Sequence, residues 1–319
     1  MIEVKNLTKR YGNHLAVDHL NFTVESGKIY GFLGPNGAGK STTMNIMTGY
    51  LGATEGQVLI DEHDILKEPE EAKKNIGYLP EIPPLYMEMT VREYLEFAAE
   101  LKGIKKDKRE SQIEEVIRLA KLRDVENRLI QNLSKGYKQR VGLAQAVLGF
   151  PEIIILDEPT VGLDPKQIIE IRELIRKLAK KHTVILSSHI LAEVREVCDY
   201  IMIISEGKLV ASDTTENLEN MMSGKGQIEV EAKASRDEMD HIIRRTGKIK
   251  EVKYRTSASG ITTAQITAKG GEDIREELFL AFSHADVPML TLNQSKTTLE
   301  EIFLELTQGS GNRMIKEEK

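Results

Sequence analysis

Short apolar runs rich in β-branched residues alternate with segments of helical spacing up to about residue 204. This alternation predicts an α/β core in which helices cover a largely parallel sheet. The clearest predicted strands are residues 28–34, 152–156, 183–188 and 200–204. Between the second and third strands, four apolar residues follow the spacing of one helix face and predict a helix packed on the core: Ile168, Ile171, Ile175 and Leu178.

Residues 90–148 show helical spacing without a clear strand among them. Thr90 and Glu93 stand in the spacing of a capping box, which predicts that a helix begins after Thr90. We therefore expect a helical subdomain, at about residues 82–148, inserted in the α/β core.

Polar and small residues gather at 206–227 and predict a boundary between two domains. We expect a first domain at residues 1–217, a second at 225–308 and a mobile tail at 309–319. The second domain shows a strand, a helix, two strands, a helix and a strand, at residues 228–232, 235–246, 249–255, 261–268, 272–285 and 287–292. This is the order of a ferredoxin-like α+β unit. A final amphipathic helix would present Leu299, Ile302, Phe303 and Leu306 on one face.

The composition narrows the class of protein. With 319 residues, 40% of them hydrophobic and 29% charged, the chain is long enough for two domains and does not resemble a disordered protein. A net charge of −6 argues against general affinity for nucleic acid. The single cysteine, Cys198, is typical of a reducing compartment. No signal peptide or apolar run of membrane-spanning length is present, so we expect a cytoplasmic protein.

A phosphate-binding loop lies between the predicted strand 28–34 and a predicted helix. Residues 34–41 match the pattern G-x-x-x-x-G-K-[ST]. Glycines allow backbone N–H groups to surround phosphate oxygens, Lys40 supplies a cation, and Ser41 offers an oxygen to Mg²⁺. The candidate nucleotide-binding residues are Gly34, Pro35, Asn36, Gly37, Ala38, Gly39, Lys40, Ser41 and Thr42.

Two further strands end in residues suited to nucleotide chemistry. Asp157 and Glu158 follow the strand 152–156, where the first carboxylate can bind Mg²⁺ and the second can polarise a water. The alternative is that they merely cap the next helix. His189 closes the strand 183–188, at the edge where α/β sheets place ligand-binding residues. We expect His189 to contact the γ-phosphate.

Taken in order, these motifs resemble the nucleotide-binding subunit of an ABC transporter over nearly all of residues 1–217. "GPNGAGKST" is similar to the family's Walker A motif, "LSKGYKQR" to its signature, "IIILDEPT" to its Walker B motif, "GLD" to its D-loop and "SSH" to its switch histidine. The resemblance implies a P-loop NTPase cassette with a mixed sheet, which binds ATP and Mg²⁺ and hydrolyses ATP.

The resemblance assigns further residues. It implies that Tyr11 stacks on adenine and that Asp164 links two nucleotide sites, although Pro165 beside Asp164 also suits a plain helix start. In the family two cassettes dimerise head to tail. The helix start at Ser134, Lys135 and Gly136 would therefore cover ATP held by a second ATP-binding subunit, identical or not.

Two positions depart from the family pattern. Glu81 stands where a glutamine usually joins Mg²⁺ to the membrane-coupling segment. It either reaches the metal through water or leaves that role to the loop that follows. Lys135 and Tyr137 replace a glycine and a glutamine of the common signature; Lys135 either adds a cation near the partner's phosphates or points to solvent.

The form of the signature, "GYLPE" and the C-terminal domain resemble the subgroup that drives export of drugs, antibiotics or ions through separately encoded permeases. This resemblance implies that the chain lies at the inner face of the cell membrane and binds integral membrane permease subunits. Two alternatives are a soluble ABC ATPase acting on nucleic acid or ribosomes and a regulatory nucleotide switch. The single P-loop and the absence of long heptads argue against the first, and Glu158 argues against the second. The second domain has either a dimer-contact or regulatory role or a merely structural one.

Overall fold

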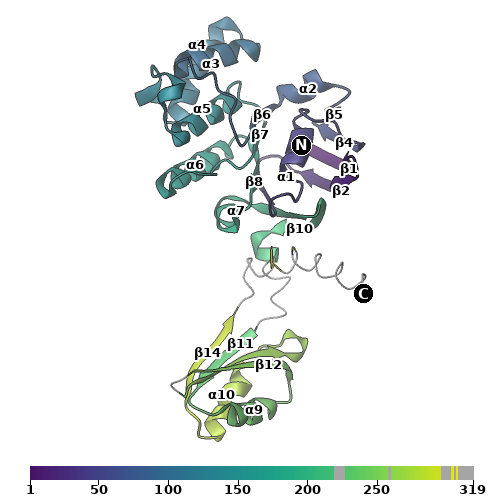
Figure 1. Ribbon diagram of the computed structural model, residues 1–319, viewed down its shortest axis with the longest axis vertical. Coiled ribbons are helices and arrows are strands. Elements are labelled where there is room, and N and C mark those ends of the chain that lie inside the picture. The colour runs from purple at the N-terminus through teal and green to yellow at the C-terminus, as the bar shows by residue number, and fades with distance from the viewer. Residues whose placement is uncertain (219–226, 258–259, 296–302, 305–306, 308–319) are drawn as a thin grey trace. The chain divides into compact units, whose positions relative to one another are not determined.

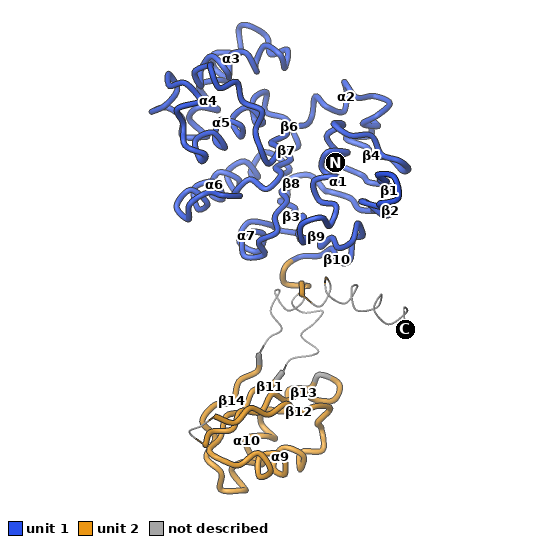
Figure 2. Tube along the Cα trace, in the orientation of Figure 1, with its two compact units in different colours: residues 1–214 blue, residues 215–319 orange. Residues whose placement is uncertain are grey.

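The computed structural model describes residues 1–218, 227–257, 260–295, 303–304 and 307 (Figure 1). It divides the chain into two compact units, Met1–Thr214 and Thr215–Lys319 (Figure 2). The first unit thus ends three residues before the predicted limit at residue 217. Most of the predicted final helix, with Leu299, Ile302 and Leu306, lies outside the described residues, as does the predicted tail at 309–319.

A six-stranded sheet forms the centre of the first unit, in the order β10-β9-β3-β8-β7-β6. Five strands run parallel and β10 pairs antiparallel with β9. Their bounds are β3 Ile29–Leu33, β6 Ile76–Leu79, β7 Ile153–Leu156, β8 Thr183–Ser188, β9 Tyr200–Ser205 and β10 Lys208–Thr214. Strands β3, β7 and β8 are buried along their whole length, which explains their apolar sequences. The four strands predicted from the sequence are confirmed.

A second sheet, in the order β2-β1-β4-β5, is antiparallel throughout. It comprises β1 Ile2–Tyr11, β2 His14–Val24, β4 Glu55–Ile60 and β5 His63–Asp64. Its inner face shares one apolar core with the helix α1 (Lys40–Met47) and the central sheet, including Ile2, Leu20, Phe32, Met44 and Ile185. The chain therefore has the mixed α/β fold that the sequence predicts, and this core fixes α1 against the strands that carry the candidate site.

The helical part of the first unit contains α3 Val91–Leu101, α4 Lys106–Leu119 and α5 Lys135–Val147, which contact one another; a short helix α2 (Pro69–Lys74) precedes them. The capping box is confirmed, because the Glu93 N–H donates to Thr90 Oγ1 and the Thr90 N–H to Glu93 Oε2. Short 3₁₀ turns lie at Arg123–Val125 and Ile130–Asn132. Helices α6 Pro165–Leu178 and α7 Leu191–Val197 complete the unit. In the described residues no helix is both long and apolar enough to cross a membrane.

The second unit has the element order that the sequence predicts. It contains β11 Gln227–Ala232, α9 Arg236–Arg244, β12 Ile249–Thr256, β13 Thr262–Ala268, a 3₁₀ turn Lys269–Gly271, α10 Arg275–His284 and β14 Met289–Ser295. The strands form one antiparallel sheet in the order β12-β13-β11-β14. Its own apolar core includes Ile228, Val230, Ile243, Ile266 and Phe282. The second unit thus has an apolar core of its own.

Candidate active site

Three neighbouring parallel strands bring the candidate residues to one edge of the central sheet. Strand β8 pairs with β3 on one side and with β7 on the other. The phosphate-binding loop follows β3, the pair Asp157 and Glu158 follows β7, and His189 follows β8. Parallel strands present their carboxyl ends at the same edge, so residues more than a hundred positions apart in sequence meet there.

The phosphate-binding loop depends on its glycines for space. A Cβ atom on Gly34 would lie 2.4 Å from the carbonyl oxygen of Ile204, and one on Gly39 would lie 2.5 Å from that of Ala16. Gly39 also has a φ of +102° at the start of α1. Only glycine fits both constraints. Lys40, the first residue of α1, folds back so that its ammonium donates to the carbonyl oxygen of Gly34 at 2.7 Å.

Glu158 links the lysine of this loop to the histidine of the neighbouring strand. Its Oε1 lies 3.5 Å from Lys40 Nζ, and its Oε2 lies 2.9 Å from His189 Nδ1. Lys40 and Glu158 are only 5% and 7% exposed. Two buried opposite charges thus compensate each other, while the side chain of His189 is 40% exposed. The structure brings together the three side chains for which the sequence predicts phosphate chemistry.

Ser187 connects the two carboxylates to strand β8. Its hydroxyl donates to Asp157 Oδ1 at 2.5 Å and accepts the N–H of Glu158 at 2.8 Å. Ser41 Oγ donates to the same Asp157 oxygen at 3.3 Å. The backbone of Glu158 has a φ of +48°, a conformation that is costly for any residue with a side chain. The hydrogen bond from Ser187 helps to hold it.

A cavity of about 510 Å³ opens above these groups. It is lined by residues 36–42, Glu158 and His189, and also by Tyr11 and Glu81. Tyr11 is half exposed and lies under the ammonium of Lys9 at 5.3 Å from its ring centre. Gly34 and Pro35 contribute carbonyl oxygens that accept from Lys40 at the base of the loop. Of the predicted ATP-binding residues, Tyr11 and residues 36–42 therefore line one cavity, and Gly34 and Pro35 do not line it.

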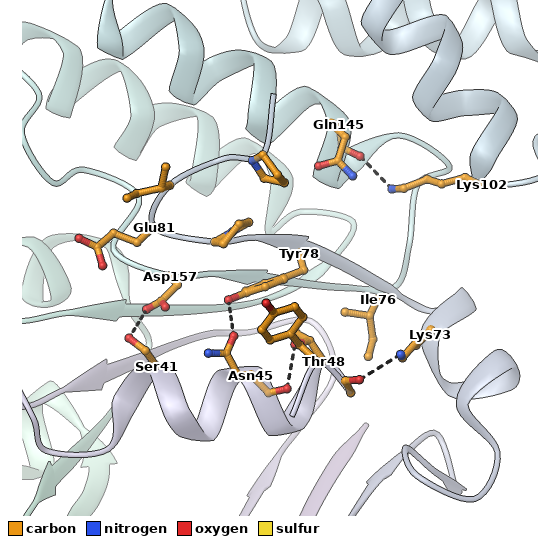
Figure 3. A pocket seen from close by; sticks show the side chains of 15 residues that line it. Ser41, Asn45, Thr48, Lys73, Ile76, Tyr78, Glu81, Lys102, Gln145 and Asp157 are labelled. Carbon is orange, nitrogen blue, oxygen red and sulfur yellow. Dashed lines mark hydrogen bonds between the residues drawn. The ribbon is translucent and has the colours of Figure 1, made fainter. Parts of the chain in front are cut away.

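A second cavity, of about 870 Å³, lies between α1, β6 and the loop that follows β6 (Figure 3). Ser41, Asp157 and Glu81 line one end, and Lys73 and Lys102 line the other. The hydroxyl of Tyr78 donates to Asn45 at 3.0 Å on its wall. Burial, and then the nearby Asp157 carboxylate, raise the pKa of Tyr78 above its ordinary value, so this hydroxyl stays protonated. Glu81 lines both cavities and stands between them.

The residues from 134 to 136 lie outside the cavity that Lys40 lines. Ser134 caps α5, because its hydroxyl accepts the N–H of Tyr137 at 3.4 Å. A Cβ on Gly136 would lie 2.4 Å from the side chain of Gln167, and one on Gly162 would lie 2.2 Å from Lys135 Nζ. The start of α5 thus packs against the start of α6 within the same chain.

The D-loop residue Asp164 lies in that same contact region. Its side chain accepts the N–H of Gln167 at 2.9 Å and so caps α6. Asp164 therefore caps a helix start, which is one of the two roles that the sequence allows for it. No residue of the chain's own cavity contributes to this cap.

Residues 17–161 match the sequence model of the ABC transporter family. The chain is 44% identical over 212 residues to the bacitracin transport ATP-binding protein BcrA of Bacillus licheniformis, a match that covers 66% of this chain and 68% of that protein. It is 30% identical over 308 residues to the linearmycin resistance ATP-binding protein LnrL of Bacillus subtilis, which covers 96% and 98%.

The chain belongs to the ATP-binding proteins of ABC transporters. Among solved structures it is similar to the dimeric cassette MJ0796 in a post-hydrolysis state with ADP and phosphate, at 28% identity and a TM-score of 0.61 over 67% of this chain and 98% of that one. The family fold predicted from the sequence is thus confirmed, and the chain is an ATP hydrolase that powers transport.

Ser187 of this ABC ATP-binding protein is not among the site residues that the sequence predicts. It lies within the motif "SSH", but a buried serine in a strand gives no sign of a functional role in the sequence. The role of Ser187 depends on how β8 pairs with β7. Ser187 lies one strand away from Asp157 and is fully buried, and its hydroxyl makes two hydrogen bonds there.

Replacing Ser187 by alanine should leave the buried N–H of Glu158 without an acceptor. We expect Ser187→Ala to lower the free energy of unfolding by about 1–3 kcal/mol and to reduce ATP hydrolysis. Chemical denaturation and an ATPase assay would measure both effects. Ser111→Ala, at an exposed position of α4, is the matched control. Wild-type stability and turnover in Ser187→Ala would contradict the role of this hydrogen bond.

Proposed function

We propose that the chain hydrolyses ATP in the cavity above Lys40 and thereby drives export of an antimicrobial compound through a separate permease. The observation that carries the proposal is the cluster of Lys40, Glu158 and His189 at the end of three parallel strands. Groups that bind phosphate and a group that can orient water lie within one cavity there.

In this proposal the backbone N–H groups of residues 36–42 and the ammonium of Lys40 hold the phosphates, and Tyr11 stacks on adenine. Ser41 and Asp157 fit Mg²⁺, because their oxygens already lie 3.3 Å apart and Mg²⁺ prefers oxygen ligands. Glu81 would reach the metal through water. When bound, Mg²⁺ would neutralise charge that develops on the phosphates.

Glu158 changes partner when ATP binds. In the structure its carboxylate neutralises Lys40, whereas the phosphates would take over that ammonium and free the carboxylate. Glu158 then orients a water and accepts its proton as the water oxygen bonds to the γ-phosphorus and the bond to the β–γ bridging oxygen breaks. The products are ADP and phosphate. His189, which lines the same cavity as Lys40, would contact the γ-phosphate during this step.

A second ATP-binding subunit would complete the site. Ser134, Lys135 and Gly136 lie at a helix start, where free N–H groups and the helix dipole favour an anion, yet they lie outside their own chain's cavity. Their proposed ligand is the γ-phosphate on the opposite subunit, and Asp164 would lie at the contact between the two sites. The dimeric state of the similar cassette MJ0796 supports this arrangement.

The permease would dock over the second cavity. Tyr50 and Ile82 line it and are each 82% exposed, and the adjoining surface includes the exposed Tyr86 and Leu101. Exposed apolar side chains gathered in one region are typical of a protein contact. Because Glu81 lines both cavities, a permease segment seated there would lie next to the metal ligands. The chain would thus bind at the inner face of the membrane.

The names of the relatives support an antimicrobial cargo. One relative that is similar to this chain over nearly its whole length is named as a linearmycin resistance protein, and others are named as bacitracin and lantibiotic transport proteins. Resistance suggests that the direction of transport is outward. Transport of such a compound by cells that hold this chain and its permease would test the cargo directly.

Replacing Glu158 by glutamine should stop hydrolysis but preserve ATP binding. A carboxylate that takes the proton of water contributes about 100-fold or more, so we expect turnover of Glu158→Gln to fall by at least that factor. The ATP-bound variant should accumulate as a dimer, measured by size-exclusion chromatography with light scattering.

Glu152→Gln, at the exposed residue immediately before β7, is the control and should keep wild-type turnover. Hydrolysis by Glu158→Gln at the wild-type rate would contradict the proposed role. A variant that stays monomeric with saturating ATP would count against the dimer.

Replacing Ser134 by arginine should separate binding from hydrolysis. The bulky side chain would block the approach to the partner's phosphate, while the cavity that Lys40 lines stays unchanged. We expect Ser134→Arg to lose hydrolysis and to bind ATP as the wild-type chain does, as measured by titration of the isolated chain. Ser111→Arg, on the exposed face of α4, is the matched control. Equal loss of binding and hydrolysis would mean that Ser134 serves its own chain.

A further inference from the structure

A buried carboxylate that has no part in the proposed site lies directly behind it. Glu193, on α7, is only 6% exposed. Carboxylates are rarely buried to this extent unless they are paired, because the charged form loses its hydration. Its partners therefore indicate what it does.

One oxygen of Glu193 holds two loops together. Its Oε2 accepts the hydroxyl of Thr160 at 2.5 Å and the hydroxyl of Ser188 at 3.2 Å. Thr160 lies two residues after Glu158, and Ser188 lies immediately before His189. A single atom thus connects the segment that carries the proposed water-orienting carboxylate with the segment that carries the proposed phosphate-contacting histidine.

The other oxygen connects this pair of loops to α6. Glu193 Oε1 lies 3.9 Å from a guanidinium nitrogen of Arg172, which comes from the helix that Asp164 caps. Arg172 also forms an ion pair with Glu196, an exposed residue of α7. Glu193 is therefore compensated by one cation and two hydroxyls, and each belongs to a different segment of the site.

The segment after β7 needs such support. Glu158 has a φ of +48°, and the turn closes when the N–H of Val161 donates to the Glu158 carbonyl at 3.2 Å. A strained residue keeps its conformation only when its surroundings hold it. Ser187 holds the backbone of Glu158 itself, and Glu193 holds the next part of the turn through Thr160.

The segment after β8 is held in the same way. The Ser188 hydroxyl donates to Glu193 and accepts the N–H of Ile190 at 3.0 Å, so it bridges the two sides of His189. His189 itself contacts Glu158 at 2.9 Å. A movement of either loop relative to the other would change that distance.

We propose that Glu193 is a positioning residue for ATP hydrolysis, which fixes Glu158 and His189 relative to each other through Thr160 and Ser188. The proposal rests on the hydrolytic roles assigned above to those two residues. Glu193 contacts neither of them and lines neither cavity. Its removal should therefore affect turnover far more than ATP binding.

The test compares Glu193→Ala with the wild-type full chain in an ATPase assay with Mg²⁺ and in an ATP-binding titration. Small displacements of reacting groups are costly, so we expect kcat to fall roughly 10- to 100-fold. The KM for ATP and the ATP affinity should stay within about two-fold of wild type. Glu193→Gln keeps one acceptor oxygen and should restore most of the turnover. Thr160→Val removes one donor and should cause part of the loss.

Glu196→Ala is the matched control, because Glu196 lies on the same helix and pairs with the same arginine but is exposed. It should keep wild-type turnover. In a Glu158→Gln background, adding Glu193→Ala should cause a smaller loss of turnover than in the wild-type chain, because one of the two groups that Glu193 positions is already gone. If Glu193 were needed only for folding, Glu193→Ala would lower turnover by the same factor in the wild-type chain and in the Glu158→Gln variant.

Wild-type kcat in Glu193→Ala would overturn the proposal, as would equal losses of turnover and ATP affinity. If Glu193→Ala does not fold, wild-type turnover in both Glu193→Gln and Thr160→Val would overturn it instead. Absence of hydrolysis by the wild-type chain, with its permease present, would be a failure of the proposed function and not of this inference.

Discussion

The buried ion pair between Lys40 and Glu158 is the contact on which the rest of the site depends. Both side chains are almost fully enclosed, and their charged atoms lie 3.5 Å apart. Removing one partner of such a pair typically costs about 3–5 kcal/mol, because the other charge is left buried and uncompensated. The pair is therefore stable only until another anion reaches Lys40. In the proposed reaction the phosphates of ATP are such an anion, and this exchange would link ATP binding to the release of Glu158.

The fold provides this pair with fixed supports. Parallel pairing of β3, β8 and β7 brings three loops to one edge, and the shared core with α1 fixes the first of them. The two other loops are held by hydrogen bonds of buried polar side chains. Ser187 joins Asp157 to the backbone of Glu158, and Glu193 joins the segments beyond. These groups require one specific geometry, because each buried hydroxyl or carboxylate must find its partner.

Much of this could be predicted from the sequence. The glycines and Lys40 belong to a motif whose spacing is set by phosphate binding. Strands β7 and β8 are apolar runs that end in polar residues. Strand β6 and the sheet of β1, β2, β4 and β5 were not among the clear predictions. Strand β6 has only four residues, and register shifts interrupt the pairing of β1 with both of its neighbours. The roles of Ser187 and Glu193 could not be predicted from the sequence. They depend on which residues face each other across strands and between helices, and a serine or glutamate within a helix or strand gives no local sign of that.

The most direct measurement is a crystal structure of the chain with Mg²⁺ and a non-hydrolysable ATP analogue. We expect Lys40 Nζ to contact the phosphates and no longer Glu158, and Ser134 of a second copy to cover the γ-phosphate. An ion pair between Lys40 and Glu158 that persists beside the bound nucleotide would contradict the proposed exchange of partners. A γ-phosphate enclosed by residues of one chain alone would contradict the proposed dimer.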